Sequence, residues 1–379
     1  MTQRRKFLAA AGAGGAGLLP LPVVAQSTAL PVVKWRMTSS FPKSLDTVFG
    51  ATEGIARRVA SATGGKFIIQ VFAAGEIVPA LQAMDAVQNH TVECAHTAPY
   101  FYFGKDPAFA FGCAVPFGMN ARQQNAWMQH GGGMALMREF YATYNIIHFP
   151  AGNTGAQMGG WFRREIKTTA DLKGLKFRVG GFAGRVLAKL GVVPTQIAAS
   201  DIYPSLERGQ IDAAEWVGPY DDEKLGFHKV AKYYYYPGWW EGGPELDLFV
   251  NRDAWNKLPA EYQSILEAAC AEANVTMLAK YDALNPAALR RLVVNHQVQL
   301  RPFSREILTA CWYAANEIYA EESAKNPKFK KIYDAWKIFR DDQILWSRVA
   351  EQNFDHFMAG ANQLPKRAVG DVVPTAKKL

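Results

Sequence analysis

The stretch VVKWRMTSSFPKSLDTVFGATEGIARRVASATGGKFIIQVF, residues 32–72, shows the folding pattern of the chain in its shortest form. Residues 32–37 predict a β-strand, and TSSFP at 38–42 opens a helix that runs to about residue 62. A glycine pair forms a turn before a second predicted strand at 67–72. Strands that alternate with helices in this way predict a mainly parallel α/β sheet.

The same alternation continues outward from this stretch. Further strands are predicted at 91–97, 146–150, 175–179, 211–216 and 246–250. From Pro259 onward the pattern is helical. We therefore expect two α/β lobes with the helical last third packed across both. Ligands of such folds bind in the cleft at the strand ends.

The N-terminus has the pattern of a targeting signal. Arg4, Arg5 and Lys6 precede an apolar stretch that ends in small residues at Ala25. This order is typical of a cleaved export signal, and the paired arginines suggest the twin-arginine route. Gln3 departs from the usual motif, so the Sec route stays open. A membrane anchor is the alternative, but a Gly-rich, Pro-interrupted segment spans a bilayer poorly.

Charge and cysteine content exclude several classes of protein. The net charge of +8 falls to +5 once the three basic residues of the export signal are removed. The other Lys and Arg are interspersed with Asp and Glu, which argues against a nucleic-acid partner and indicates a weak attraction for anionic solutes. The four cysteines form no CxxC motif, so we expect buried free thiols, with one disulfide as the alternative.

Motifs of common enzymes are missing from the sequence. It contains no P-loop, HExxH or GxSxG pattern. GGFAG at 180–184 follows a predicted strand, but it lacks the order of a phosphate-binding loop and predicts a turn. Asp221, Asp222 and Glu223 follow Pro219 and predict a solvated turn. We therefore expect a binding protein and not an enzyme.

Three segments place polar side chains in apolar surroundings. Arg178 interrupts the apolar strand LKFRV, and a buried guanidinium requires an anionic partner. That partner is either a glutamate of the chain or a carboxylate ligand, which matches the planar fork of arginine. Glu215 and Glu241 each stand beside tryptophan, and a segment of small residues contains Asn153 and Gln157.

These segments belong to strings that resemble one protein family. From Trp35 to about Phe357 the chain resembles the extracytoplasmic solute receptors of TRAP transporters, most closely the branch that binds 2-oxo monocarboxylates. The strings that carry the resemblance are SSFPKSLD at 39–46, YFGKDP at 102–107, GGWFRRE at 159–165, EWVGPYDD at 215–222 and YPGWWE at 236–241.

The resemblance implies a two-lobed periplasmic-binding-protein-like fold and a role for particular residues. Arg178 matches the arginine that clamps the substrate carboxylate. A cation beside the substrate is implied to be held by Gln157, Glu215, the carbonyl of Trp216 and Glu241. The same Gln157, Trp216 and Glu241 are implied to contact the substrate, with Asn153 and Tyr100 completing the wall. Gly180 replaces a proline of many members, which favours the keto-acid branch over dicarboxylate or sialic-acid receptors.

A charge count supports a cation independently of the resemblance. Two glutamates, one arginine and a monocarboxylate sum to −2, which is costly in a dry pocket. Oxygen ligands favour a hard ion such as Na⁺ or Ca²⁺. The count favours Ca²⁺, whereas the keto-acid branch implies Na⁺, which we take as the expectation. A lactate or other 2-hydroxy acid receptor with Ca²⁺ and an exported keto-acid enzyme, with Glu215 or Glu241 as base, are the alternatives.

The expected domain boundaries follow from these patterns. They are an export signal at 1–25, a first lobe at 26–150 to which later segments return, a second lobe at 151–255, a helical region at 256–360 and a flexible tail at 361–379. Apolar residues between Ile332 and Phe357 recur at near-helical spacing and form either core or a homodimer contact. The resemblance also implies a periplasmic location and a membrane permease as partner.

Overall fold

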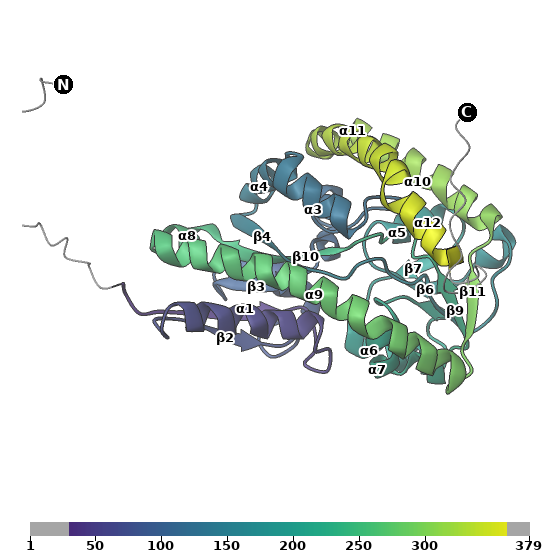
Figure 1. The fold of residues 1–379 in the computed structure, drawn as a ribbon, viewed down its shortest axis with the longest axis horizontal. Coiled ribbons are helices and arrows are strands. Elements are labelled where there is room, and N and C mark those ends of the chain that lie inside the picture. The colour runs from purple at the N-terminus through teal and green to yellow at the C-terminus, as the bar shows by residue number, and fades with distance from the viewer. Residues whose placement is uncertain (1–29, 362–379) are drawn as a thin grey trace, which may run out of the picture. The chain divides into compact units, whose positions relative to one another are not determined.

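The computed structural model of the protein describes residues 30–361. The predicted export signal lies outside the described residues. So does the predicted tail, apart from Ala361, which ends the last helix. In the unit that begins at Val33, two sheets and their covering helices correspond to the two expected lobes (Figure 1).

The first sheet contains the strands predicted near the start of the chain. Its order is β2-β1-β3-β10-β4, and β1 pairs in parallel with β2 and β3. The late strand β10 lies between β3 and β4 and is antiparallel to both. The bounds are β1 (Val33–Ser39), β2 (Phe67–Phe72), β3 (Cys94–Thr97), β4 (Ile146–Asn153) and β10 (Glu245–Asn251).

The second sheet has the order β11-β9-β5-β8-β6-β7. Strand β5 is antiparallel to both β8 and β9, whereas β6 is parallel to β7 and β8. Both sheets are therefore mixed. Among the described strands, parallel pairs outnumber antiparallel ones by five to four, so the expectation of mainly parallel sheets holds only by a narrow margin. The bounds are β5 (Gly160–Phe162), β6 (Lys176–Arg178), β7 (Val193–Thr195), β8 (Ala213–Ala214), β9 (Tyr233–Tyr236) and β11 (Gln299–Pro302).

One long helix, α9 (Ala260–Val294), packs against both lobes. Its first part packs on α1 and β4, and its later part packs on α7 (Figure 1). The remaining α-helices are α1 (Val48–Ala62), α2 (Ala83–Gln88), α3 (Ala121–His130), α4 (Gly133–Ala142), α5 (Ala183–Lys189), α6 (Ala199–Glu207), α7 (Pro219–Leu225), α8 (Arg252–Asn256), α10 (Arg305–Lys325), α11 (Pro327–Val349) and α12 (Glu351–Ala361). Short 3₁₀ turns are η1 (Ala80–Gln82), η2 (Pro99–Tyr102), η3 (Pro107–Gly112), η4 (Thr169–Leu172) and η5 (Phe227–Lys229).

Two segments cross between the sheets side by side. The first crossing, residues 154–159, joins β4 to β5, and the second crossing, residues 237–244, joins β9 to β10. The amide of Gln157 donates to the carbonyl of Glu241 at 3.1 Å, and the amide of Gly238 donates to the carbonyl of Gln157 at 2.9 Å. A pair of short connecting segments is a common hinge between lobes.

The apolar stripe near the C-terminus has two different environments. Ile332 and Trp336 are buried in the core. Leu345, Trp346 and Phe357 are 60%, 55% and 63% exposed. The interpretation as core is therefore confirmed for the earlier part of the stripe, and a homodimer contact stays a prediction for the exposed later part.

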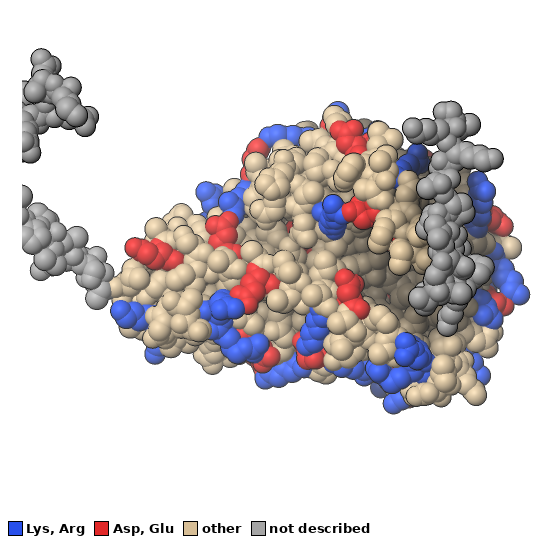
Figure 2. All heavy atoms as spheres, viewed as in Figure 1, with Lys and Arg blue, Asp and Glu red and all other residues tan. Residues whose placement is uncertain are grey.

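Other expectations concern thiols, charge and membranes. Within the described residues all four cysteines are buried and free, as predicted. Positive and negative side chains are interspersed on the face shown in Figure 2. No helix in the described part of the chain is long and apolar enough to cross a bilayer.

Candidate functional site

Arg178 lies at the end of β6 with only 2% of its surface exposed. Its Nη1 donates to the carbonyl oxygen of Glu215 at 2.5 Å and to Oε1 of the same residue at 2.6 Å. Its Nε donates to the carbonyl of Ile197 at 3.3 Å, and the guanidinium lies 5.1 Å from the ring centroid of Trp216. Among the described residues, Nη2 has no hydrogen-bond acceptor. The protein thus fixes the guanidinium and leaves one nitrogen available.

Glu215 follows the short strand β8 and is completely buried. Its Oε1 accepts from Arg178 and from the amide of Gly180 at 2.7 Å. Its Oε2 has no hydrogen-bond partner within residues 30–361. Burial raises the pKa of this carboxyl, and the charge of Arg178 opposes that shift. One oxygen of Glu215 therefore orients the arginine while the other is left unsatisfied.

Glu241 enters from the second crossing and is 2% exposed. Its Oε2 accepts from the indole of Trp240 at 3.1 Å, and its Oε1 is unpartnered in the described structure. Burial, followed by the nearby charge of Glu215, raises the pKa of Glu241 well above its usual value. Two buried carboxyls thus share one guanidinium, and one further positive charge is needed when both ionise.

Gln157 joins these groups from the first crossing. One atom of its side-chain amide lies 2.6 Å from Oε2 of Glu241 and 2.7 Å from the carbonyl oxygen of Trp216. The other amide atom lies 3.0 Å from Oγ1 of Thr154. With nitrogen toward Glu241 the amide donates two hydrogen bonds. With oxygen toward Glu241 three oxygens converge, an arrangement that a cation between them would stabilise.

The donor set fits a hard cation. It contains two carboxylates with unpartnered oxygens, one backbone carbonyl and one amide, and no thiol or imidazole. Oxygen-only sets are typical of Na⁺, Ca²⁺ and Mg²⁺ and not of zinc. The structure thus brings together Gln157, Glu215, Trp216 and Glu241, the four residues that the sequence assigned to a cation.

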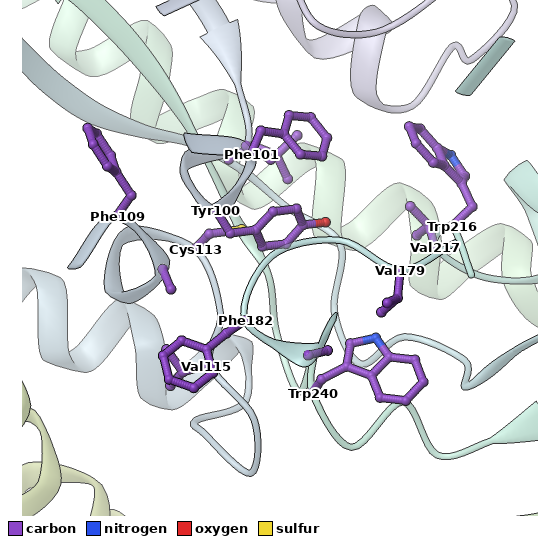
Figure 3. Close-up of a cluster of buried hydrophobic side chains, with 14 of the residues drawn as sticks. Tyr100, Phe101, Phe109, Cys113, Val115, Val179, Phe182, Trp216, Val217 and Trp240 are labelled. Carbon is purple, nitrogen blue, oxygen red and sulfur yellow. The ribbon is translucent and has the colours of Figure 1, made fainter. Parts of the chain in front are cut away.

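Tyr100, from η2 in the first lobe, packs on the glycine pair that follows β6. A β-carbon on Gly180 would lie 3.1 Å from Cε2 of Tyr100, and one on Gly181 would lie 2.9 Å from its Cβ and Cγ. In Figure 3 the hydroxyl of Tyr100 points toward the side on which Val179 and Trp216 lie. Burial and the charge of Glu241 raise the pKa of Tyr100. The expected turn at GGFAG is confirmed, and its glycines admit this aromatic ring.

A cavity of about 20 Å³ lies between the lobes at this place. It is too small for an organic ligand, so the lobes are closed in this structure. Both lobes line it, through Phe41, Val48, Ala98, Tyr100, Phe101, Cys113, Thr154, Gln157, Trp216, Val217, Pro244 and Leu246. Phe41 and Phe101 were not predicted as site residues, although Phe41 lies within the string at 39–46 and Phe101 directly precedes the string at 102–107.

Both polar atoms of the Asn153 side chain are hydrogen-bonded to the backbone of the two crossings. Its side chain is completely buried, its Nδ2 donates to the carbonyl of Gly243 at 3.1 Å, and its Oδ1 accepts from the amide of Gly155 at 2.9 Å. Of the predicted residues, Tyr100, Gln157 and Trp216 line the 20 Å³ cavity, whereas Asn153, Arg178, Glu215 and Glu241 do not. In this closed arrangement Asn153 ties the start of one crossing to the end of the other.

The acidic segment after Pro219 corrects an expectation. Asp221 and Asp222 are 0% and 1% exposed and do not form a solvated turn. Asp222 accepts from the indole of Trp161 at 2.9 Å, the hydroxyl of Tyr234 at 2.7 Å and the amide of Val217 at 3.2 Å. It therefore fastens the turn that carries Trp216 to the second sheet. Both carboxylates are buried by residues distant in sequence. Their burial therefore cannot be predicted from the local sequence pattern.

Comparison with known proteins identifies relatives along most of the chain. A family model described as bacterial extracellular solute-binding protein, family 7, matches residues 38–326. A monocarboxylate 2-oxoacid-binding periplasmic protein from Nostoc sp. is 54% identical over 332 residues, which cover 88% of this chain and 91% of that protein.

Two solved structures share the fold and confirm the predicted two-lobed architecture. A TRAP transporter solute-binding protein from Bordetella bronchiseptica RB50 is 52% identical with a TM-score of 0.87, covering 88% of this chain and 99% of that one. It is a mixed-occupancy dimer with copurified calcium and picolinate in one active site and an apo second site. A TRAP periplasmic solute-binding protein from Pseudoalteromonas atlantica T6c, 40% identical with a TM-score of 0.83 over 86% of this chain and 98% of that one, holds sodium and pyruvate.

Proposed function

The chain belongs to family 7 of the bacterial extracellular solute-binding proteins, and from this premise we propose that it binds a small 2-oxo monocarboxylate together with a cation and delivers it to a TRAP permease. The family consists of solute receptors, which confirms that the chain is a receptor and not an enzyme. The protein is extracytoplasmic, and we propose the periplasm as its location, reached through the export signal at residues 1–25.

The observation that carries the proposal is that the protein, within residues 30–361, uses only two of the three guanidinium nitrogens of Arg178 as hydrogen-bond donors. Glu215 and Ile197 occupy Nη1 and Nε, and the described residues provide no acceptor for Nη2. A buried guanidinium favours an anionic partner. A carboxylate oxygen can accept a hydrogen bond from its free N–H in the plane of the group. Arg178 is therefore proposed to bind the substrate carboxylate, with Tyr100 and Asn153 completing the site.

We propose that Gln157, Glu215, the carbonyl of Trp216 and Glu241 hold the cation. When bound, the cation offsets the carboxylates and gives the ligand a second point of attachment. With a monocarboxylate present the protein groups and ligand sum to −2, so Na⁺ leaves −1 and Ca²⁺ leaves zero. The relative from Pseudoalteromonas holds sodium and that from Bordetella calcium, and we take Na⁺ as the ion with Ca²⁺ as the alternative.

The class of ligand follows from having an anion site beside a cation site. A 2-oxo acid can place its carboxylate on Arg178 and its 2-oxo oxygen beside the cation. In this position it would also contact Gln157, Trp216 and Glu241. Picolinate, found in the Bordetella protein, has a ring nitrogen in the equivalent position next to its carboxylate. A 2-hydroxy acid such as lactate offers a neutral hydroxyl there and is the second candidate.

Calorimetry with pyruvate, a longer 2-oxo acid, lactate and picolinate, each with Na⁺, with Ca²⁺ and with neither ion, tests the proposal. We expect heat with the 2-oxo acids and a dependence on the ion. Arg178→Ala should abolish binding, and Arg178→Lys, which keeps the charge without the fork, should weaken it. Thermal unfolding of each variant checks the fold. Absence of heat with every acid under every condition would refute the ligand class.

We also propose that the protein forms a homodimer through α11 and α12. These helices expose Leu345, Trp346, Val349, Phe354 and Phe357 by 55% to 72%. Contiguous apolar surface of this kind marks contact sites in soluble proteins. A second copy is the favoured occupant because the Bordetella relative is itself a dimer.

A further inference from the structure

Two contacts outside the lining of the ligand cavity join the lobes directly. Thr47 stands just before α1 in the first lobe, and Asp221 lies in the first turn of α7 in the second. Oγ1 of Thr47 donates to Asp221, 2.7 Å from Oδ1 and 2.9 Å from Oδ2. Tyr281 of α9 donates to Oδ2 of Asp221 at 2.6 Å. Thr47 and Asp221 are 2% and 0% exposed, so this contact is sealed from water.

The second contact lies beside the first, at the protein surface. Asp46 pairs with Lys224 of α7 and accepts from the hydroxyl of Tyr220 at 3.3 Å. Lys280 of α9 donates to Oδ2 of Asp46 at 2.7 Å and to its carbonyl oxygen at 2.6 Å. The side chain of Asp46 is 50% exposed. Exposed ion pairs contribute little and are screened by salt, so the buried contact is the stronger of the two.

Helix α7 links these contacts to the binding site, because it directly follows the segment that carries Trp216. No residue of α7 lines the cavity itself. Asp222 accepts from the amide of Val217 and is anchored to Trp161 and Tyr234 of the second sheet. The segment from Trp216 to α7 is therefore fixed to the second sheet. Neither Asp46, Thr47 nor Asp221 lines the cavity between the lobes.

We propose that the Thr47–Asp221 and Asp46–Lys224 contacts form a latch that stabilises the closed form and sets how long the ligand stays bound. The latch rests on the proposed function, because it acts on the closed lobes that enclose the ligand. Opening separates Thr47 from Asp221 and Asp46 from Lys224. A ligand held only in the closed form loses apparent affinity by the factor by which that form is depopulated. Thr47 and Asp221 are thus positioning residues that act through closure.

The test compares Thr47→Val, which keeps the shape and removes the donor, with Thr47→Ser, which keeps the donor. Stopped-flow fluorescence with pyruvate and with a longer 2-oxo acid measures binding and release. We expect Thr47→Val to release both acids about tenfold faster, since a hydrogen bond to a charged group carries at least that weight. The ratio of the two affinities and the cation dependence should stay unchanged. Thr47→Ser should match the wild type, and Asp46→Asn should have a smaller, salt-dependent effect.

Small-angle scattering of the ligand-free protein gives an independent measurement. We expect a larger radius of gyration for Thr47→Val than for the wild type, since more molecules are open. Unchanged release rates together with identical scattering would overturn the latch, and so would a changed preference between the two acids. If the wild type binds no 2-oxo acid, the proposed function fails, and the scattering comparison alone decides the latch.

Discussion

The ring of Tyr100 lies directly on the backbone of Gly180, and a β-carbon at that position would come within 3.1 Å of Cε2. The contact joins the first lobe to the strand end that carries Arg178. We expect Gly180→Val to weaken ligand binding by roughly 5- to 150-fold, because overpacking at a closed contact costs about 1–3 kcal/mol. Calorimetry measures this, and Gly180→Ala should have an intermediate effect.

Gly50 provides the matched control for that experiment. It lies in α1 with open space where its β-carbon would stand. Gly50→Ala should leave ligand affinity unchanged. If Gly180→Val bound as tightly as the wild type, the closed contact between Tyr100 and Gly180 would have no role in binding.

Glu241 offers a way to test the cation separately from the ligand. Glu241→Gln keeps the shape of the side chain and removes one negative charge beside Glu215. We expect the variant to need at least about tenfold more Na⁺ or Ca²⁺ for half-maximal binding, since charge count tunes the affinity of oxygen sites. A cation titration at fixed pyruvate measures the change. Glu245→Gln, which neutralises another buried glutamate, should leave the cation requirement as it is.

The sequence predicted much of the site because the signal is local. Arg178 in an apolar strand and glutamates beside tryptophan are visible without a structure, and the family resemblance assigned them to one place. The structure brings Arg178, Gln157, Glu215 and Glu241 together, and their roles in binding stay predictions. Asn153 was harder to place, since an amide in a small-residue segment can face a ligand or brace the backbone.

Long-range features were beyond the reach of the sequence. Asp221 is buried by Thr47, 174 residues earlier, so its acidic neighbourhood was misread as a solvated turn. Strand β10 returns from the second lobe and pairs antiparallel with β3 and β4, which no local periodicity reports. The latch and the mixed sheets both depend on such distant partners.

Glu245 gives a prediction about stability and pH. It is completely buried at the start of β10, and neither of its carboxyl oxygens has a hydrogen-bond partner among the described residues. Burial, followed by the charge of Asp247, raises the pKa of Glu245 well above its usual 4.5. The folded state therefore favours the protonated carboxyl. Its contribution to stability is full below about pH 4.5 and is lost as the pH rises toward the folded-state pKa.

We expect Glu245→Gln to raise the free energy of unfolding at pH 8 by about 1–3 kcal/mol, because glutamine has no carboxyl to ionise, whereas each unit by which burial raises the pKa of a glutamate removes about 1.4 kcal/mol of stability at high pH. At pH 4 the variant and the wild type should be nearly equal. Urea unfolding of the ligand-free protein at the two pH values measures the difference. An equal shift at both would mean that the change in stability does not come from the carboxyl's charge.

The last prediction concerns the exposed face of α11 and α12. Trp346 is 55% exposed and Leu345 is 60% exposed, near the end of a helix whose earlier residues Ile332 and Trp336 are core. A charge placed in a dimer contact is costly because it loses water without gaining a partner. Trp346→Glu should therefore give a monomer at micromolar concentration by light scattering, where the wild type gives a dimer.

Val294→Glu, a 69% exposed position at the end of α9, is the control that should stay dimeric. A wild type that is already monomeric would refute the dimer, and a Trp346→Glu dimer would move the interface to another face.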